Sequence, residues 1–172
     1  TIPERGHATC GDLILGADSH ACTYGALNIF AAGISATDLA VTLACGKNWL
    51  RVPETIKISV RGKLPAGVYA KDIMLAITRM VGVDGAHYKA IEFTGDAIAD
   101  MSIDARFTMA NMVAELGAKA GLMEADKKTL AWVAERSRRA PAPVAADRDA
   151  KYCREIVIDA SRITPQIARP HA

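Results

Sequence analysis

The sequence predicts an α/β fold, a three-layer α/β/α domain in which helices cover a mostly parallel sheet. Short apolar runs that resemble strands alternate with amphipathic segments that resemble helices, and this order implies parallel strands joined by crossover helices. Hydrophobic residues make up 51% of the 172 residues but aromatic residues only 5%, which favours small side chains packed against helices over a β-sandwich. This length suits one domain with a sizeable core, so we expect residues 1–172 to form a single domain.

The first expected elements are short and rich in small apolar residues. Residues 13–15 are expected to form a strand buried on both faces, and Gly16 to let the chain leave the sheet sharply. Closely spaced small residues on either side of Gly33 predict two short helices over 26–32 and 37–45, packed deep against the sheet.

Clearer hydrophobic periods follow. Residues 54–61 alternate Ile56, Ile58 and Val60 with polar residues, as in a half-buried strand. Apolar positions at helical or strand spacing predict the remaining elements: a helix over 70–81, a strand over 88–94, a helix over 104–116 that ends at Gly117, a strand over 119–123, a helix over 126–137 and a strand over 155–159.

Residues 138–149 are expected to form an exposed linker before the last strand, because residues 138–146 contain two prolines and no hydrophobic period. Pro165 and Pro170 are expected to keep the tail from forming a helix. Since the chain starts at Thr1 and neither end forms an element of its own, we expect a fragment of a longer polypeptide.

Composition excludes several classes of function. A net charge of +2 is too small for a nucleic-acid-binding or membrane-binding surface. No apolar run reaches the ~20 residues of a membrane span and no secretory signal opens the chain, so we expect a cytoplasmic protein. The cysteines lack CxxC spacing and are expected to be free structural thiols rather than metal ligands: Cys10, Cys22, Cys45 and Cys153.

Three polar residues with useful chemistry, Asp18, Ser19 and His20, follow the first expected strand. Ligands in α/β sheets usually bind beyond the carboxyl ends of strands. If the extended backbone continues, Asp18 and His20 point to the same side, where the carboxylate would orient the imidazole as an acid–base pair for proton transfer with an alcohol. Ser19 would offer its hydroxyl to a substrate or to a metal-bound group.

Two structural alternatives remain open for these residues. Asp18 or Ser19 can cap the next helix, and His20 and Asp18 can form a purely structural hydrogen bond. A serine-hydrolase triad is excluded, because adjacent side chains on an extended backbone alternate in direction and the chain has no G-x-S-x-G motif.

Several motifs occur in order along almost the whole chain: residues 16–20, 22–27, Gly33 with 37–38, 46–49, 52–57, 82–85, 88–95, 111–115 and 117–119. In this order they resemble the large subunits of 3-isopropylmalate dehydratases, in the aconitase superfamily. The resemblance implies a hydro-lyase that interconverts 2-isopropylmalate and 3-isopropylmalate by dehydration and rehydration, in leucine biosynthesis. It also implies a [4Fe-4S] cluster that acts as a Lewis acid, and a small subunit as the partner in a heterodimer.

Two alternatives to this function stay open. Homoaconitases and methylmalate-type or dimethylmalate-type dehydratases share the motifs and differ in the malate that they accept. A non-catalytic binding or assembly module is the alternative from another class.

The resemblance implies roles for individual residues. It makes Asp18 and His20 catalytic and Ser19 substrate-binding. It matches Glu92 to a carboxylate near the cluster and places Asn111 and Glu115 in the supporting surroundings of the site.

This chain also departs from the family pattern. Ala21 stands where the family usually has Thr, and Ala110 where it often has Cys. In the family, the cysteine ligands of the cluster lie beyond the end of this chain and a further active-site histidine lies just before Thr1. We therefore expect no metal ligand within this chain, and no activity of the 172-residue fragment by itself.

Overall fold

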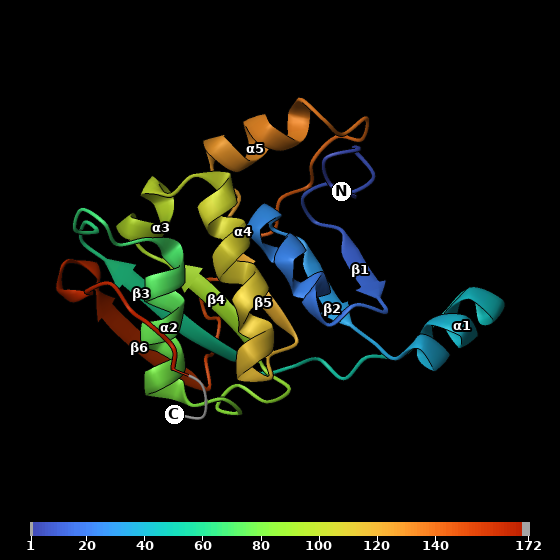
Figure 1. The fold of residues 1–172 in the computed structure, drawn as a ribbon. Coiled ribbons are helices and arrows are strands. Elements are labelled where there is room, and N and C mark those ends of the chain that lie inside the picture. Colours follow the sequence, from blue (N-terminus) through green and yellow to red (C-terminus); the bar gives the residue numbers. More distant parts are fainter. Residues whose placement is uncertain (1, 170–172) are drawn as a thin grey trace.

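The computed structural model describes residues 2–169 and shows an α/β fold with two parallel sheets (Figure 1). The smaller sheet pairs β1 (Leu13–Gly16) with β2 (Phe30–Gly33). The larger sheet has the order β5-β4-β3-β6, and its strands are β3 (Thr55–Arg61), β4 (Ala90–Thr94), β5 (Ala120–Met123) and β6 (Arg154–Asp159). The predicted α/β class with a parallel sheet is confirmed.

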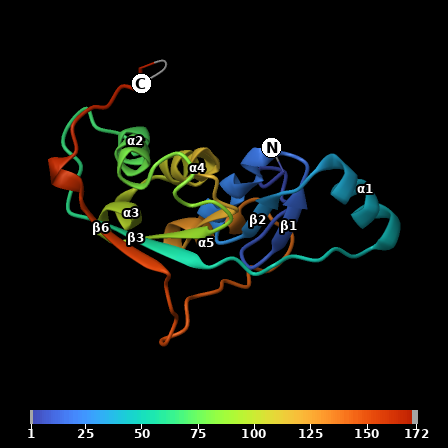
Figure 2. The same ribbon diagram turned by 90° about the horizontal axis from the view of Figure 1, so that it is seen from below.

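Helices α2 (Ala70–Val81) and α4 (Ile103–Asn111) cover one face of the larger sheet (Figures 1 and 2). Every second residue of β3 is buried against them, which is the expected result of period-2 alternation. The opposite face, which carries Lys57 and Glu92 at paired positions, borders a cavity lined by residues of the 144–152 segment. The other helical segments are α1 (Ala36–Cys45), α3 (Asp96–Asp100), α5 (Lys127–Ala134) and the 3₁₀ segments η1 (Ser19–Leu27), η2 (Met112–Leu116) and η3 (Ala160–Arg162).

All elements predicted from residue 54 onward are confirmed in type, with small shifts at their ends. The helix expected over 104–116 is α-helical only to Asn111 and tightens into η2, as helix ends often do. Gly117 then ends it in the left-handed conformation at φ 73°, as expected.

The helix predicted over 26–32 is wrong. Segment η1 stops at Asn28, which adopts the left-handed conformation (φ 60°), and the next residues form strand β2. Hydrogen bonds from the Asn28 amide to the carbonyls of Met123 and Val144, at 3.0 and 2.9 Å, hold this turn. Small residues such as those of this segment show no clear period, so the sequence did not distinguish a helix from a strand here.

Two expectations about burial are also wrong. The helix expected over 37–45 is present as α1, but none of its residues is buried, and it projects from the body of the molecule (Figure 1). In strand β1, expected to be buried on both faces, Leu13 is 64% exposed. An apolar run predicts that its residues favour burial, but it does not show which other segment of the protein covers them.

Residues 138–149 contain no helix or strand, yet this segment is tied to the smaller sheet. The guanidinium of Arg139 donates to both oxygens of Asp12, at 2.9 and 2.5 Å. The Ala142 N–H donates to the carbonyl of Cys10 at 3.0 Å. Residues 163–169 form no helix, and Pro170 lies outside the described residues.

No helix within residues 2–169 is long and apolar enough to cross a membrane.

A methyl group added at Gly25 is expected to disrupt the packing of η1 on β5, because its carbon would lie 1.7 Å from the carbonyl oxygen of Gly121. Gly25→Ala should therefore lower the free energy of unfolding by about 3 kcal/mol or prevent folding. Gly67→Ala is the control: it has a positive φ but open space, and should cost about 1 kcal/mol. Urea unfolding measures both, and equal midpoints for Gly25→Ala and the wild type would contradict the expectation.

Candidate active site

The backbone turns where β1 ends, and this turn places the three predicted site residues. Asp18 is extended (φ −117°, ψ 130°) and caps η1: its Oδ1 accepts a hydrogen bond of 2.7 Å from the backbone N–H of His20. Because η1 begins at Ser19, the backbone does not stay extended through His20. The expectation that the Asp18 carboxylate orients the imidazole is thus wrong, and Asp18 is a cap instead.

The imidazole of His20 lies between a hydroxyl and a different carboxylate. Ser19 Oγ is 3.0 Å from Nδ1, and Glu115 Oε1 is 3.5 Å from Nε2. The side chains of His20 and Glu115 are 39% and 63% exposed, so small molecules can reach both. Glu115 was expected only in the supporting surroundings of the site, because a contact between residues so far apart in the chain leaves no trace in local spacing.

Asn111 joins the end of α4 to η1 behind His20. Its amide donates to Thr23 Oγ1 at 2.9 Å, and Thr23 Oγ1 donates to the His20 carbonyl at 2.6 Å. Cys22 adds a thiol contact of 3.6 Å to the Asn111 carbonyl, and burial raises the pKa of this thiol to about 11. Cys22 is therefore a protonated packing residue.

Ala21 and Ala110, the two departures from the family pattern, are buried at 7% and 0% exposure. Neither belongs to the cavity beside the site, so these positions contribute packing.

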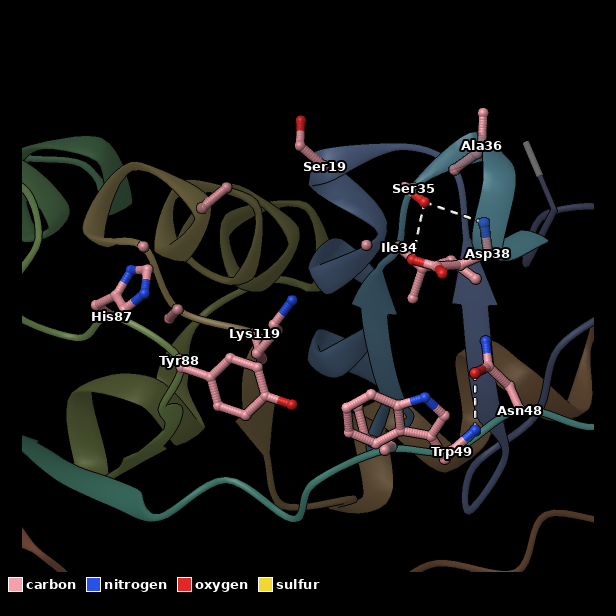
Figure 3. A pocket seen from close by; sticks show the side chains of 16 residues that line it. Ser19, Ile34, Ser35, Ala36, Asp38, Asn48, Trp49, His87, Tyr88 and Lys119 are labelled. Carbon is pink, nitrogen blue, oxygen red and sulfur yellow. Dashed lines mark hydrogen bonds between the residues drawn. The ribbon is translucent and has the colours of Figure 1, made fainter. Parts of the chain in front are cut away.

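A cavity of about 800 Å³ lies beside Ser19 and Ala114, the sequence neighbours of His20 and Glu115 (Figure 3). One wall comes from residues 33–36, 38 and 48–50. The other comes from Ala114 of η2 and from residues just before β4 and β5. Lys119 is the only lysine or arginine in the described lining, and its Nζ lies 5.0 Å from the ring centroid of Tyr88. The cavity thus combines a cationic group and a carboxylate, that of Asp38, with both polar and apolar residues.

Glu92 is not part of this arrangement. Both oxygens of its carboxylate accept from the Tyr152 hydroxyl at 3.1 Å, and Lys57 Nζ lies 4.7 Å from the centroid of the Tyr152 ring. These residues border a second cavity, of about 850 Å³, which shares no described lining residue with the first. Alternation along β4 was the missed signal: Ile91 and Phe93 are buried in the main core, so Glu92 faces the other side.

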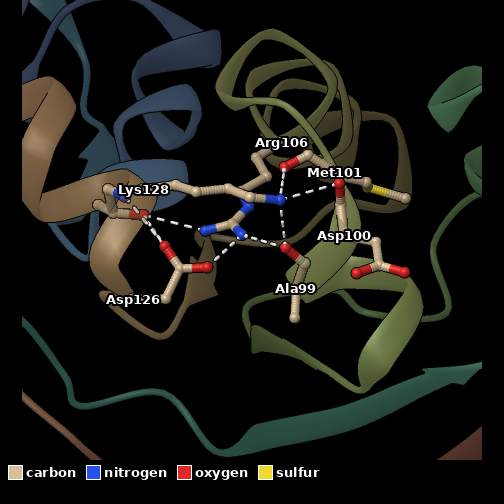
Figure 4. A network of polar contacts seen from close by, with 7 residues as sticks. Ala99, Asp100, Met101, Arg106, Asp126 and Lys128 are labelled. Carbon is tan, nitrogen blue, oxygen red and sulfur yellow. Dashed lines mark hydrogen bonds and ion pairs between the residues drawn. The ribbon is translucent and has the colours of Figure 1, made fainter.

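A buried arginine holds α4, the helix that ends at Asn111 (Figure 4). Arg106, 1% exposed, donates to Thr129 Oγ1 and to the carbonyl of Ala99, both at 3.0 Å, and forms an ion pair with Asp126. These bonds join α4 to α3 and α5. Burial opposes ionisation of Asp126, but the hydrogen bonds from Arg106 and from the Thr129 N–H outweigh it and lower the carboxyl pKa to about 2.

The described residues do not fit an iron–sulfur ligand set. Within residues 2–169, no group of three or more His, Cys, Asp and Glu side chains is placed to hold a metal ion. The four cysteines are free: Cys10 and Cys22 are buried, whereas Cys45 and Cys153 are exposed.

Comparisons with known proteins agree with this arrangement of motifs. The model of the Aconitase family (aconitate hydratase) matches residues 1–172. Over 170 residues the chain is 51% identical to the 3-isopropylmalate dehydratase large subunit of Clostridium kluyveri, covering 99% of this chain and 40% of that protein. It is 48% identical to the large subunit 1 of Methanopyrus kandleri over 98% of this chain and 40% of that protein. It is 49% identical to the large subunit 1 of Pyrococcus furiosus over 99% of this chain and 40% of that protein. The chain thus spans about 40% of the length of these relatives.

Protonation of Asp126 is expected to destabilise the fold in acid. Its pKa is about 2 in the folded protein against an ordinary value of 3.8, so its ion pair adds stability that is present above about pH 4 and is lost as the pH falls toward about 2. Because 33% of this side chain is exposed, we expect a contribution of about 1–2 kcal/mol.

Asp126→Asn is the matched variant, since asparagine can still cap α5. Urea unfolding of both proteins from about pH 6 to about pH 3 should show their difference in free energy of unfolding shrinking as the pH falls. A difference independent of pH would contradict this account.

Proposed function

The chain belongs to the aconitase family, and from this premise we propose that it is part of the large subunit of a 3-isopropylmalate dehydratase. The proposed reaction is the interconversion of 2-isopropylmalate and 3-isopropylmalate by loss and return of water, in leucine biosynthesis. The observation that carries the proposal is the contact of His20 with Glu115 beside a cavity. This contact lies in a chain that is about 50% identical, over almost its whole length, to 3-isopropylmalate dehydratase large subunits.

Loss of water needs an acid for the departing hydroxyl and a base for the hydrogen on the neighbouring carbon. We assign the exchange of a proton with the substrate hydroxyl to His20, and we place the base that accepts the carbon-bound hydrogen outside this chain. Glu115 holds the ring from the Nε2 side, and the Ser19 hydroxyl contacts the ring at Nδ1 and binds the substrate. Asp18 acts through the backbone of His20, so its proposed role is to hold the turn.

The cavity supports a substrate with both carboxylate and branched apolar groups. Lys119 supplies a positive charge that suits a carboxylate, and Ile34, Trp49 and Leu50 supply apolar surface for an alkyl branch.

The cofactor and the partner follow from the family. A [4Fe-4S] cluster would supply Lewis-acid chemistry. Because the described residues do not fit its ligand set, we place the cysteine ligands elsewhere in the longer polypeptide and assign no step to the cluster here. The relatives are named large subunits, so we also propose a small subunit as partner. We further propose a cytoplasmic location, where the proposed biosynthetic reaction would take place.

Glu115→Gln in the assembled enzyme should lower kcat by about 10²–10³-fold, because the His20 ring loses the carboxylate that holds it at Nε2. Glu92→Gln is the matched control: it removes a carboxylate from the other cavity and should leave kcat within about threefold. Steady-state kinetics with isopropylmalate measure both, and a larger loss in Glu92→Gln than in Glu115→Gln would reverse the assignment.

The 172-residue chain by itself should not dehydrate isopropylmalate, because its described residues do not hold the cluster. Ultraviolet absorbance of the unsaturated acid measures this. Turnover by the purified fragment would refute the proposed division of the site between this chain and the rest of the protein.

A further inference from the structure

Helix α1 and the segment after it form an apolar surface that no described residue covers. Here the α1 arm means residues 36–52. Seven of the ten residues of α1 are Ala, Cys, Leu or Val, yet none is buried. The exposed large hydrophobic residues of the arm are Val41 (54% exposed), Leu43 (78%), Trp49 (83%) and Val52 (85%).

Such a surface is not stable in water by itself. A helix of about ten residues is marginal without tertiary contacts, and a helix that is apolar on most sides is normally buried. Asp38 is the only charged residue of α1, with Thr37 and Thr42 as further polar residues, and Lys47 and Arg51 lie in the segment after it. Most of the surface of the helix is therefore apolar. Contiguous exposed apolar surface of this kind marks an interface.

The arm is continuous with the candidate active site. Asn48, Trp49 and Leu50 line the same cavity as Ser19, together with residues 33–36 and Asp38 (Figure 3). A partner that covers the arm therefore also completes a wall of that cavity.

We propose that the α1 arm packs against a part of the same large subunit that lies outside residues 1–172. This rests on the proposed function, in which the chain is one piece of that subunit. The relatives are about two and a half times as long as the matched region, which is 40% of their length, so they contain ample further chain.

The shape and chemistry of the arm favour this occupant. A projecting helix that is apolar on most sides has to be enclosed from several directions, and a longer polypeptide does this more readily than the single flat patch of a separate subunit. Helix α1 carries almost no charge. This composition is typical of a permanently buried core, whereas interfaces between separately folded subunits have a polar rim.

Hydrogen exchange followed by mass spectrometry tests the proposal on the full-length large subunit, alone and with the small subunit. In the large subunit alone, amides of residues 36–45 are expected to exchange at least about a hundredfold more slowly than in an unfolded peptide. Dilution and addition of the small subunit should leave this protection unchanged. Protection that needs the small subunit, or that disappears on dilution, would overturn the proposal in favour of a subunit interface or a second copy.

A pair of variants adds an independent check. Leu43→Glu in the full-length large subunit should accelerate exchange over residues 36–45 at least about tenfold, while Leu43→Met, which keeps apolar volume, should not. Equal exchange in both variants would show that Leu43 stays in solvent and would also overturn the proposal.

Failure of the proposed function would look different. A large subunit whose arm is protected but whose assembled complex does not act on isopropylmalate would refute the function and leave this inference standing. A native polypeptide no longer than residues 1–172, measured by intact mass, would remove the occupant and so refute the inference.

Discussion

The close approach of η1 to β5 determines how the molecule is arranged. The backbones of Gly25 and Gly121 are so near that no side-chain carbon fits between them. This contact fixes the smaller sheet against the larger one, and η1 also packs along α4. His20 near the start of η1 and Glu115 just past α4 can meet only because these segments dock in this way. The geometry of the candidate site is therefore a property of the packing between the two sheets.

Elements with a clear hydrophobic period could be predicted from the sequence. Ile56, Ile58 and Val60 alternate with polar residues and form the buried face of β3. The failure over 26–32 has a physical cause in long-range structure, since the turn at Asn28 depends on carbonyls of Met123 and Val144 that come from far along the chain. Small apolar residues carry little periodic information, so such distant bonds decided between helix and strand.

The candidate site shows the same division between local and distant information. The turn at Asp18, Ser19 and His20 could be located because a short strand ends there, and capping of the next helical segment was one of the open alternatives. The pairing of His20 with Glu115 could not be predicted, because it depends on tertiary packing. One local signal was available: Asn111 and Glu115 are four residues apart, which places two polar side chains on the same side of a helical segment.

The position of β6 has a consequence for how the chain folds during synthesis. This strand pairs with β3. Just before β6 begins, the Cys153 thiol donates a hydrogen bond to the carbonyl of Thr55, 98 residues earlier. Until the ribosome has produced those residues, the outer edge of β3 lacks a neighbour and presents free backbone groups to other nascent chains. Closing so long a loop is slow, so this edge stays unpaired for longer than an edge whose partner strand lies nearby in the sequence.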